Sequence, residues 1–182
     1  MSELMRNYYN IEMGGYLYAI FMIPYEPKQT KKDLVAYLIH HTATLLLLWL
    51  SYIYSFHRGG IIVAVLHDVS DPLMELAKIV LYAGYNKIAD MFFGLFALTF
   101  IVTRNGLLPF MISLIPRYLV YPDGSYMPSN FIMRSIQLFL CTLELLHIYW
   151  ATLIIKMAYK ALVEKGVSDD IRDVDQEKSK VQ

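Results

Sequence analysis

Residues 34–56 read LVAYLIHHTATLLLLWLSYIYSF, a run that contains no formally charged residue. A membrane-spanning helix needs about 20 consecutive apolar residues, so this stretch is predicted to cross a membrane. It nevertheless carries two adjacent imidazoles, His40 and His41, near its start. Polar side chains inside a membrane segment are costly and are typical of functional sites. The histidine pair is therefore the first candidate for chemistry.

The composition of the whole chain indicates an integral membrane protein. Of the 182 residues, 57% are hydrophobic and only 18% are charged, whereas a soluble domain is about half apolar and a quarter charged. The formal net charge is zero, which argues against a nucleic-acid partner. A single cysteine, Cys141, excludes a disulfide framework within the chain and a cysteine-based metal site.

The apolar runs predict an all-α, polytopic membrane helix bundle with about five spans. These spans cover approximately residues 8–23, 33–56, 61–82, 88–103 and 131–159. Residues 105–130 are expected to form a mixed region, with an apolar piece followed by a turn-rich piece. We expect residues 1–164 to form the transmembrane domain and the polar tail, residues 165–182, to be disordered.

The basic residues predict the orientation of the bundle. Lysines lie between the first two predicted spans, between the third and fourth, and after the fifth. Arginines lie on the opposite side, namely Arg6, Arg58, Arg104, Arg117 and Arg134. Because Lys and Arg together are enriched on the cytosolic side and the lysine-rich segments share one side, we expect these segments and the C-terminal tail to be cytosolic.

The predicted third span is rich in titratable side chains. Within twelve residues it holds His67, Asp68, Asp71, Glu75 and Lys78. A charge in the middle of a membrane costs about 2.5–3.5 kcal/mol, so these groups are expected to face the bundle interior or a wet cavity and to pair. The last four are three, four and three positions apart, which predicts one helical stripe.

Simpler interpretations of these residues stay open. Asp71 precedes Pro72, and an Asp-Pro step is typical of a helix start, so the span would break there with Asp71 as the N-cap. Glu75 and Lys78 would then form an ordinary salt bridge. The histidine pair would serve packing, and two further buried-polar candidates, Glu144 and His147, would serve helix pairing.

The residue types favour acyl transfer. A desolvated imidazole stays neutral and therefore nucleophilic and basic. A carboxylate such as Asp68 or Asp71 would fix its tautomer and stabilise the imidazolium that forms. The imidazole would either accept the acyl group or remove a proton from an attacking amine. A metal-dependent hydroxylase is the alternative chemistry, but it needs several histidines with shared helix faces, and no two of the five histidines are three or four positions apart.

The sequence HHTATLLLLWLSYIYSFHRGG, followed by IIVAVLHDVSDPLMELAKIVLY, resembles the longevity-assurance motif of the ceramide synthases, which lies within the TLC domain. The residues that match the motif are His40, His41, Thr44, Ser51, Tyr52, Arg58, Gly60, His67, Asp68, Asp71, Leu73, Glu75, Ala77, Lys78 and Tyr82. The stretches TRNGLLPF (residues 103–110) and DDIRDVDQE (residues 169–177) extend the resemblance.

The resemblance implies N-acylation of a sphingoid base by fatty acyl-CoA, in the endoplasmic reticulum membrane. It assigns His40 and His41 as the catalytic pair, with His40 as the acyl acceptor or base, and Asp68 and Asp71 as the paired carboxylates. The remaining polar positions of the motif are expected to bind substrate: Thr44, Ser51, Tyr52, Arg58, His67, Glu75 and Lys78. Neither a metal nor a redox cofactor is implied, and fatty acyl-CoA is the co-substrate.

The expected partners are fatty acyl-CoA, a sphingoid base, the lipid bilayer and a second synthase chain in a homo- or heterodimer. Residues 118–128 match the stretch that affects acyl-chain choice in this family. Because the chain begins inside the domain, we expect a partial TLC domain with two further helices upstream. The alternative function is a non-catalytic TLC-type membrane protein that binds lipid or partners an active synthase.

Overall fold

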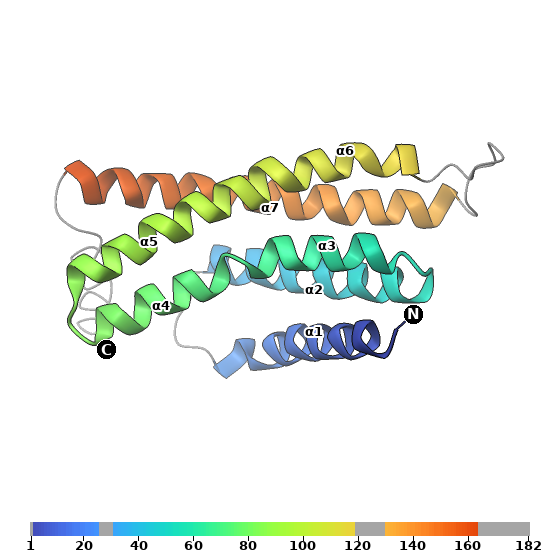
Figure 1. Cartoon of the computed structure of the whole chain (residues 1–182), viewed down its shortest axis with the longest axis horizontal. Helices are drawn as coiled ribbons and strands as arrows, with labels where there is room; N and C mark the ends of the chain where they lie inside the picture. The colour runs from blue at the N-terminus through green and yellow to red at the C-terminus, as the bar shows by residue number, and fades with distance from the viewer. Residues whose placement is uncertain (1, 26–30, 119–129, 164–182) are drawn as a thin grey trace. The chain divides into compact units, whose positions relative to one another are not determined.

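The computed structural model describes residues 2–25, 31–118 and 130–163, and the regular elements in these ranges are all helices. The predicted all-α fold is confirmed. The elements are α1 (Glu3–Met22), the 3-10 helix η1 (Ile23–Tyr25), α2 (Lys31–Ile53), α3 (His57–Asp68), α4 (Asp71–Tyr82), α5 (Asn86–Phe100), the π-helix η2 (Ile101–Leu107), α6 (Leu108–Tyr118) and α7 (Asn130–Val163) (Figure 1). The predicted tail, residues 165–182, and residues 119–128 lie outside the described ranges.

In the described part of the chain, three helical stretches are long and apolar enough to cross a membrane. They are Asp33–Ile53, Asn86–Leu114 and Phe131–Lys160. The predicted spans near residues 8–23 and 61–82 are helical, but they are not among these three. The region of residues 61–82 is divided between α3 and α4, which have 12 residues each, fewer than the roughly 20 that a single crossing needs.

The predicted third span is broken between α3 and α4. Ser70 is the N-cap of α4, and Pro72 occupies its first turn, where the missing N–H of proline removes no helical hydrogen bond. The interpretation that the span breaks at the Asp-Pro step is confirmed, although Ser70 rather than Asp71 is the cap. Asp68 thus ends one helix and Asp71 begins the next, so the prediction of one continuous stripe is wrong.

The predicted fourth span, in contrast, is longer than expected. Helical structure continues without a break from α5 through η2 into α6, so the prediction of an end near residue 103 is wrong. The polar residues at this point are accommodated by the π-helix, which closes its hydrogen bonds over five residues instead of four. Thr103 donates its hydroxyl to the Thr99 carbonyl at 2.9 Å, which satisfies that hydroxyl within the helix.

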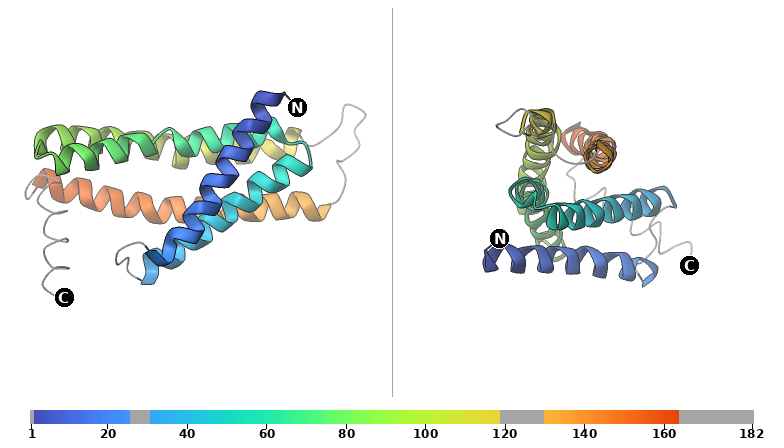
Figure 2. Two further views of the ribbon diagram at one scale, coloured as in Figure 1. Left: turned by 90° about the horizontal axis from the view of Figure 1, so that it is seen from below. Right: turned by 90° about the vertical axis from the view of Figure 1, so that its right-hand side faces the viewer.

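The described helices pack in two units, one from residues 2–25, 31–64, 108–118 and 130–146, the other from residues 65–107 and 147–163. In the first unit α1 and α2 lie side by side (Figures 1 and 2). Its core contains Tyr9, Leu48 and Ala64, contributed by α1, α2 and α3.

The core of the second unit is built from aromatic and small side chains. Phe96 and Phe100 of α5 pack with Ala151 and Ile154 of α7, and α4 adds partly buried apolar side chains. The turn between α4 and α5 passes through Gly84, whose φ of 89° lies in the left-handed region that favours glycine after a helix.

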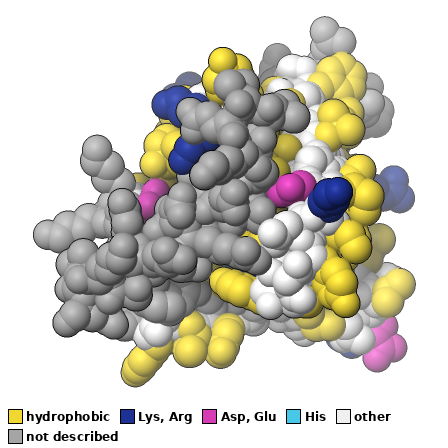
Figure 3. Space-filling model, turned by 90° about the vertical axis from the view of Figure 1, so that its left-hand side faces the viewer, with side chains coloured by type: hydrophobic (Ala, Val, Ile, Leu, Met, Phe, Trp, Pro, Cys, Tyr) yellow, Lys and Arg dark blue, Asp and Glu magenta, His cyan; other side chains and the backbone are white. Residues whose placement is uncertain are grey.

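The surface of the described helices is largely apolar. Each membrane-crossing stretch exposes large hydrophobic side chains, such as Trp49, Leu98 and Leu145. Figure 3 shows hydrophobic side chains of the described residues around one side of the molecule, together with several charged side chains. Because exposed apolar patches of this extent mark contact with lipid or another protein, this surface fits the membrane protein that the composition predicts.

A buried tyrosine connects the first three helices. The Tyr9 side chain is 0% exposed; its hydroxyl lies 2.7 Å from Ser51 Oγ and donates to the His57 carbonyl at 3.2 Å. Ser51 in turn donates to the Phe56 carbonyl at 3.0 Å. A Cβ at Gly60 would overlap both the Tyr9 and the Ser51 hydroxyls, so this close approach requires glycine.

Gly60→Ala is therefore expected to destabilise the protein by about 1–3 kcal/mol, the usual effect of overpacking a core. Gly59→Ala is the matched control, because a Cβ at Gly59 meets nothing within 4 Å and alanine favours a helix by up to about 1 kcal/mol. Thermal unfolding of both variants in detergent micelles measures the difference. Equal unfolding temperatures for the two variants would contradict the contact.

Candidate functional site

The two histidines of the pair occupy different environments on α2. His40 is buried at 7% exposure, and His41 is half-buried. Their ring centroids are 5.4 Å apart with an interplanar angle of 76°. His41 Nδ1 lies 2.9 Å from the Tyr37 carbonyl oxygen, one helical turn earlier. The pair therefore presents two close but differently oriented imidazoles.

Thr44 lies one turn beyond His40, as its spacing predicts. Its side chain is buried at 5% exposure, and its hydroxyl donates to the His40 carbonyl at 2.9 Å. This hydrogen bond satisfies a buried hydroxyl within the helix and holds Thr44 next to the histidine pair.

The next three predicted substrate-binding residues lie at the far end of α2 and the start of α3. Ser51 is about 16 Å from His40 along the helix axis, because an α-helix rises 1.5 Å per residue. Ser51 contacts Tyr9, and the Tyr52 ring packs 5.8 Å from the Tyr9 ring. Arg58 is exposed. The structure thus groups Ser51 and Tyr52 with the core tyrosine, and their role in substrate binding stays a prediction.

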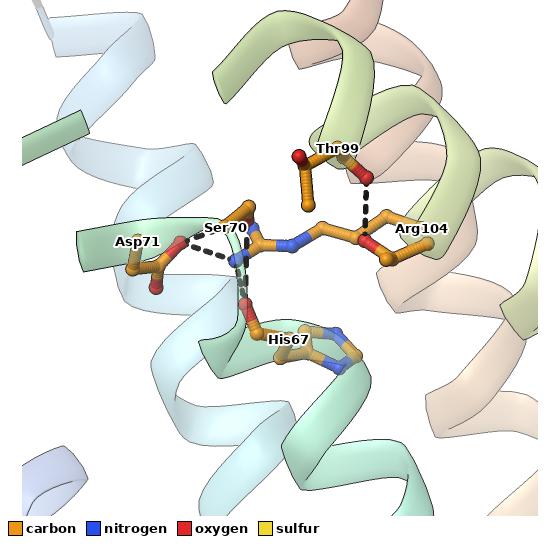
Figure 4. A network of polar contacts seen from close by, with 6 residues as sticks. His67, Ser70, Asp71, Thr99 and Arg104 are labelled. Atoms are coloured by element: carbon orange, nitrogen blue, oxygen red, sulfur yellow. Dashed lines mark hydrogen bonds and ion pairs between the residues drawn. The ribbon is translucent and has the colours of Figure 1, made fainter. Parts of the chain in front are cut away.

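The second unit holds a polar network around Arg104, at the break between α3 and α4 (Figure 4). The Arg104 guanidinium forms an ion pair with Asp71 Oδ1 at 2.5 Å and donates to the His67 carbonyl. It also lies over the Phe100 ring, 4.7 Å from the centroid. Ser70 donates to Asp71 Oδ1 at 3.2 Å, so the Asp71 carboxylate is held from two sides.

The placement of Arg104 corrects one sequence prediction. The lysine and arginine distribution placed this arginine in a connection outside the membrane, but it lies in η2, within the crossing stretch Asn86–Leu114, and is 6% exposed. The reason is tertiary: Asp71 and the His67 carbonyl satisfy a charge that a lipid-facing position would leave unpaired. In the sequence, the sign that Arg104 has a special position was that it lies in TRNGLLPF, a stretch that resembles the ceramide synthases.

A second pair of imidazoles lies beside this network. The rings of His67 and His147 are 4.7 Å apart between centroids, and both side chains are buried. The His147 ring also lies 6.2 Å from Phe100 and 6.3 Å from Trp150. His147 was expected only in helix pairing. The two histidines lie far apart in the sequence, so their spacing does not predict that their rings are in contact.

In the Arg104–Asp71 pair only the arginine is buried, since its side chain is 7% exposed and that of Asp71 is 52% exposed. The second ion pair of the motif is exposed at both side chains. Lys78 donates to Glu75 at 2.8 Å, and both side chains are about half exposed, at 47% and 58%. This is the ordinary salt bridge of the simpler interpretation, so a role of these two in substrate binding stays a prediction. Asp68 is half-buried at the end of α3. His40 belongs to the first packing unit, and Asp68 and Asp71 belong to the second. That one of these carboxylates orients the His40 imidazole also stays a prediction.

Across the described residues, no three side chains among His, Cys, Asp and Glu are grouped so that they could hold a metal ion. The candidate groups of the first unit are the imidazoles of the histidine pair and the Thr44 hydroxyl. Those of the second unit are the His67 and His147 imidazoles and the Arg104–Asp71 ion pair.

The comparison with known families identifies the domain. The TLC domain model matches residues 1–156. This chain belongs to the TLC-domain family. The match covers both packing units up to the last part of α7, and it includes the histidine pair and the Arg104 network.

Curated relatives narrow the resemblance within the TLC-domain family. The chain is 37% identical to Alternaria stem canker resistance protein 1 of Solanum lycopersicum over 166 residues, which are 88% of this chain and 53% of that protein. It is 35% identical to human ceramide synthase 5 over 172 residues (94% and 43%) and 32% identical to human ceramide synthase 3 over 166 residues (89% and 41%). The predicted resemblance to the ceramide synthases is confirmed, and the chain spans about half or less of the length of these relatives.

The Arg104 network predicts an asymmetric response to mutation. Asp71→Ala leaves a buried guanidinium without its carboxylate. Because the Asp71 side chain is itself 52% exposed, solvent screens part of the pair, and the expected destabilisation is about 1–3 kcal/mol. Adding Arg104→Met to Asp71→Ala removes the unpaired charge and should recover part of this loss. Unfolding in detergent, followed by helical circular dichroism, measures all three proteins.

Glu75→Ala is the matched control on the same helix, because it removes an exposed ion pair, which contributes less than about 1 kcal/mol. If Asp71→Ala and Glu75→Ala were equally mild, or if Arg104→Met lowered stability further in the Asp71→Ala background, the network would not have the role assigned to it.

Proposed function

We propose that this chain acts in sphingolipid biosynthesis as a ceramide synthase, which transfers a fatty acyl group from acyl-CoA to the amine of a sphingoid base. Two kinds of similarity support the proposal. The residues of the longevity-assurance motif are present, and relatives that match most of the chain are named ceramide synthase.

The observation that carries the proposal is the histidine pair on a membrane-crossing helix. His40 is buried, His41 is half-buried, and their rings lie 5.4 Å apart. Acyl transfer from a thioester to an amine needs a group that accepts the acyl chain or removes the amine proton. Two neighbouring imidazoles in an apolar helix supply such groups where an acyl chain is soluble.

The proposed division of roles follows the residues. His40 either takes the acyl group from CoA or acts as the base, and a carboxylate from Asp68 or Asp71 orients its ring and stabilises the imidazolium. The reaction requires no metal or redox cofactor in this scheme. The proposed partners are fatty acyl-CoA, the sphingoid base and the bilayer, with a second synthase chain as a dimer partner.

The test is expression of the chain in cells that lack ceramide synthase activity, with ceramide measured by mass spectrometry across a series of acyl-CoA lengths. The His40→Ala, His41→Ala double variant is expected to lower ceramide formation by about 10²- to 10⁴-fold, the usual contribution of a general base. Thr42→Ala is the control, because Thr42 is adjacent to the pair on α2 but is exposed.

The other outcomes are informative. Undiminished ceramide in the double variant rejects the mechanism. A chain that makes no ceramide but co-purifies with a full-length synthase favours the non-catalytic alternative. Bound iron in the purified protein would instead favour a metal-dependent hydroxylase.

We further propose that the protein resides in the endoplasmic reticulum membrane with its C-terminal tail in the cytosol. If α3 and α4 together make one crossing, four crossings separate residues 26–30 from the tail, and both lysine-rich ends face the cytosol, as the distribution of basic residues favours. If only Asp33–Ile53, Asn86–Leu114 and Phe131–Lys160 cross, the two ends lie on opposite sides.

Protease treatment of sealed microsomes distinguishes these arrangements. Epitopes inserted within residues 26–30 and after residue 182 should both be cleaved without detergent. Protection of one epitope and cleavage of the other would contradict the four-crossing arrangement.

A further inference from the structure

The His41 imidazole is held by contacts from two helices of the first unit. Its Nδ1 lies 2.9 Å from the Tyr37 carbonyl oxygen. Its ring lies against the Tyr37 ring, with centroids 3.8 Å apart and planes inclined by 35°. The Tyr16 ring of α1 lies 5.4 Å from the same imidazole. These contacts fix both the position and the plane of the His41 ring.

The contact with the Tyr37 carbonyl also sets the tautomer of His41. A carbonyl oxygen only accepts hydrogen bonds, so the nitrogen beside it must donate. The oxygen has two lone pairs and can accept this bond in addition to a backbone N–H. A neutral imidazole carries one N–H, so a proton on Nδ1 leaves Nε2 as the accepting nitrogen.

The two tyrosine rings make this arrangement hard to reverse. A half-turn of the imidazole about its bond to Cβ would exchange Nδ1 with a ring carbon and break the bond to the Tyr37 carbonyl. Such a rotation sweeps through the space of a stacked ring at 3.8 Å. An aliphatic side chain at position 37 would leave the carbonyl in place but would not offer a planar face.

We propose that Tyr37 and Tyr16 are positioning residues for acyl transfer, which hold His41 so that its Nε2 takes the proton from the substrate amine. The inference rests on the proposed function. In the branch of the proposed function in which His40 accepts the acyl group, that group first moves from the CoA sulfur to His40, and CoA leaves as the thiolate. The amine nitrogen then bonds to the acyl carbon, and the bond from that carbon to the His40 nitrogen breaks. The amine proton passes to Nε2, and the CoA thiolate takes it up, so His41 returns to its neutral form.

Kinetics of the full chain test the positioning role. Tyr37→Leu and Tyr16→Leu are expected to lower kcat by about 10- to 100-fold, the effect of misplacing a catalytic group, with KM little changed. Tyr37→Phe keeps the ring and should restore kcat. Trp49→Leu removes an exposed aromatic from the same helix and serves as the control for a general loss of aromatic packing.

The tautomer is tested separately by ¹⁵N NMR of the protein with ring-labelled histidine, with His41 assigned by the loss of its signals in His41→Asn. The expected signals are a protonated Nδ1 and an unprotonated Nε2 in the wild type, and a mixture of tautomers in Tyr37→Leu. A proton on Nε2 in the wild type overturns the inference, as does wild-type kcat in both leucine variants.

The two proposals fail in different ways. If the wild-type chain makes no ceramide, the proposed function fails, while NMR of the same protein still decides the tautomer. If Tyr37→Leu does not fold, as judged by gel filtration and circular dichroism, Tyr16→Leu and the wild-type spectrum decide the question.

Discussion

The buried guanidinium of Arg104 constrains much of the second unit, because hydrocarbon offers no partner to a charge and the protein must supply all of them. Its partners come from separate elements: the carboxylate of Asp71 at the start of α4, the carbonyl of His67 near the end of α3, and the ring face of Phe100 in α5. The last carbonyls of a helix lack intrahelical donors. The break after α3 thus creates the acceptor that the arginine uses, and the break and the arginine support each other.

The need of buried polar groups for partners from other elements explains which features could be predicted from the sequence. The break at Ser70–Pro72 follows from local chemistry, since a proline in the first turn of a helix acts without distant partners. Arg104 could not be placed in this way. Its neighbours in TRNG are typical of a loop, and its burial is made favourable by partners distant in the sequence, among them a carboxylate 33 positions earlier. Tyr9 is similar: tyrosines are common at membrane interfaces, and only the Ser51 and Gly60 contacts make this one a core residue.

The candidate site also has features that could be predicted from the sequence and features that depend on distant partners. Two adjacent imidazoles in an apolar run were recognisable as functional candidates from the sequence, and the helix geometry of the pair is consistent with side chains about 100° apart. Their different burial and the tautomer of His41 depend on a carbonyl one turn away and on a ring from another helix. Neither is encoded in the motif itself. The orientation of His40 by a carboxylate from Asp68 or Asp71 stays a prediction.

The π-helix Ile101–Leu107 has a consequence for how this region is compared with other sequences. Its wider turns change the angular advance per residue, so a helical wheel drawn at 100° per position from Asn86 to Tyr118 loses its phase inside this segment. Positions after Leu107 then fall on faces other than those the wheel assigns. Apolar periodicity must therefore be fitted separately on either side of the bulge, and a one-residue gap in an alignment here marks a change of helix type rather than of a loop.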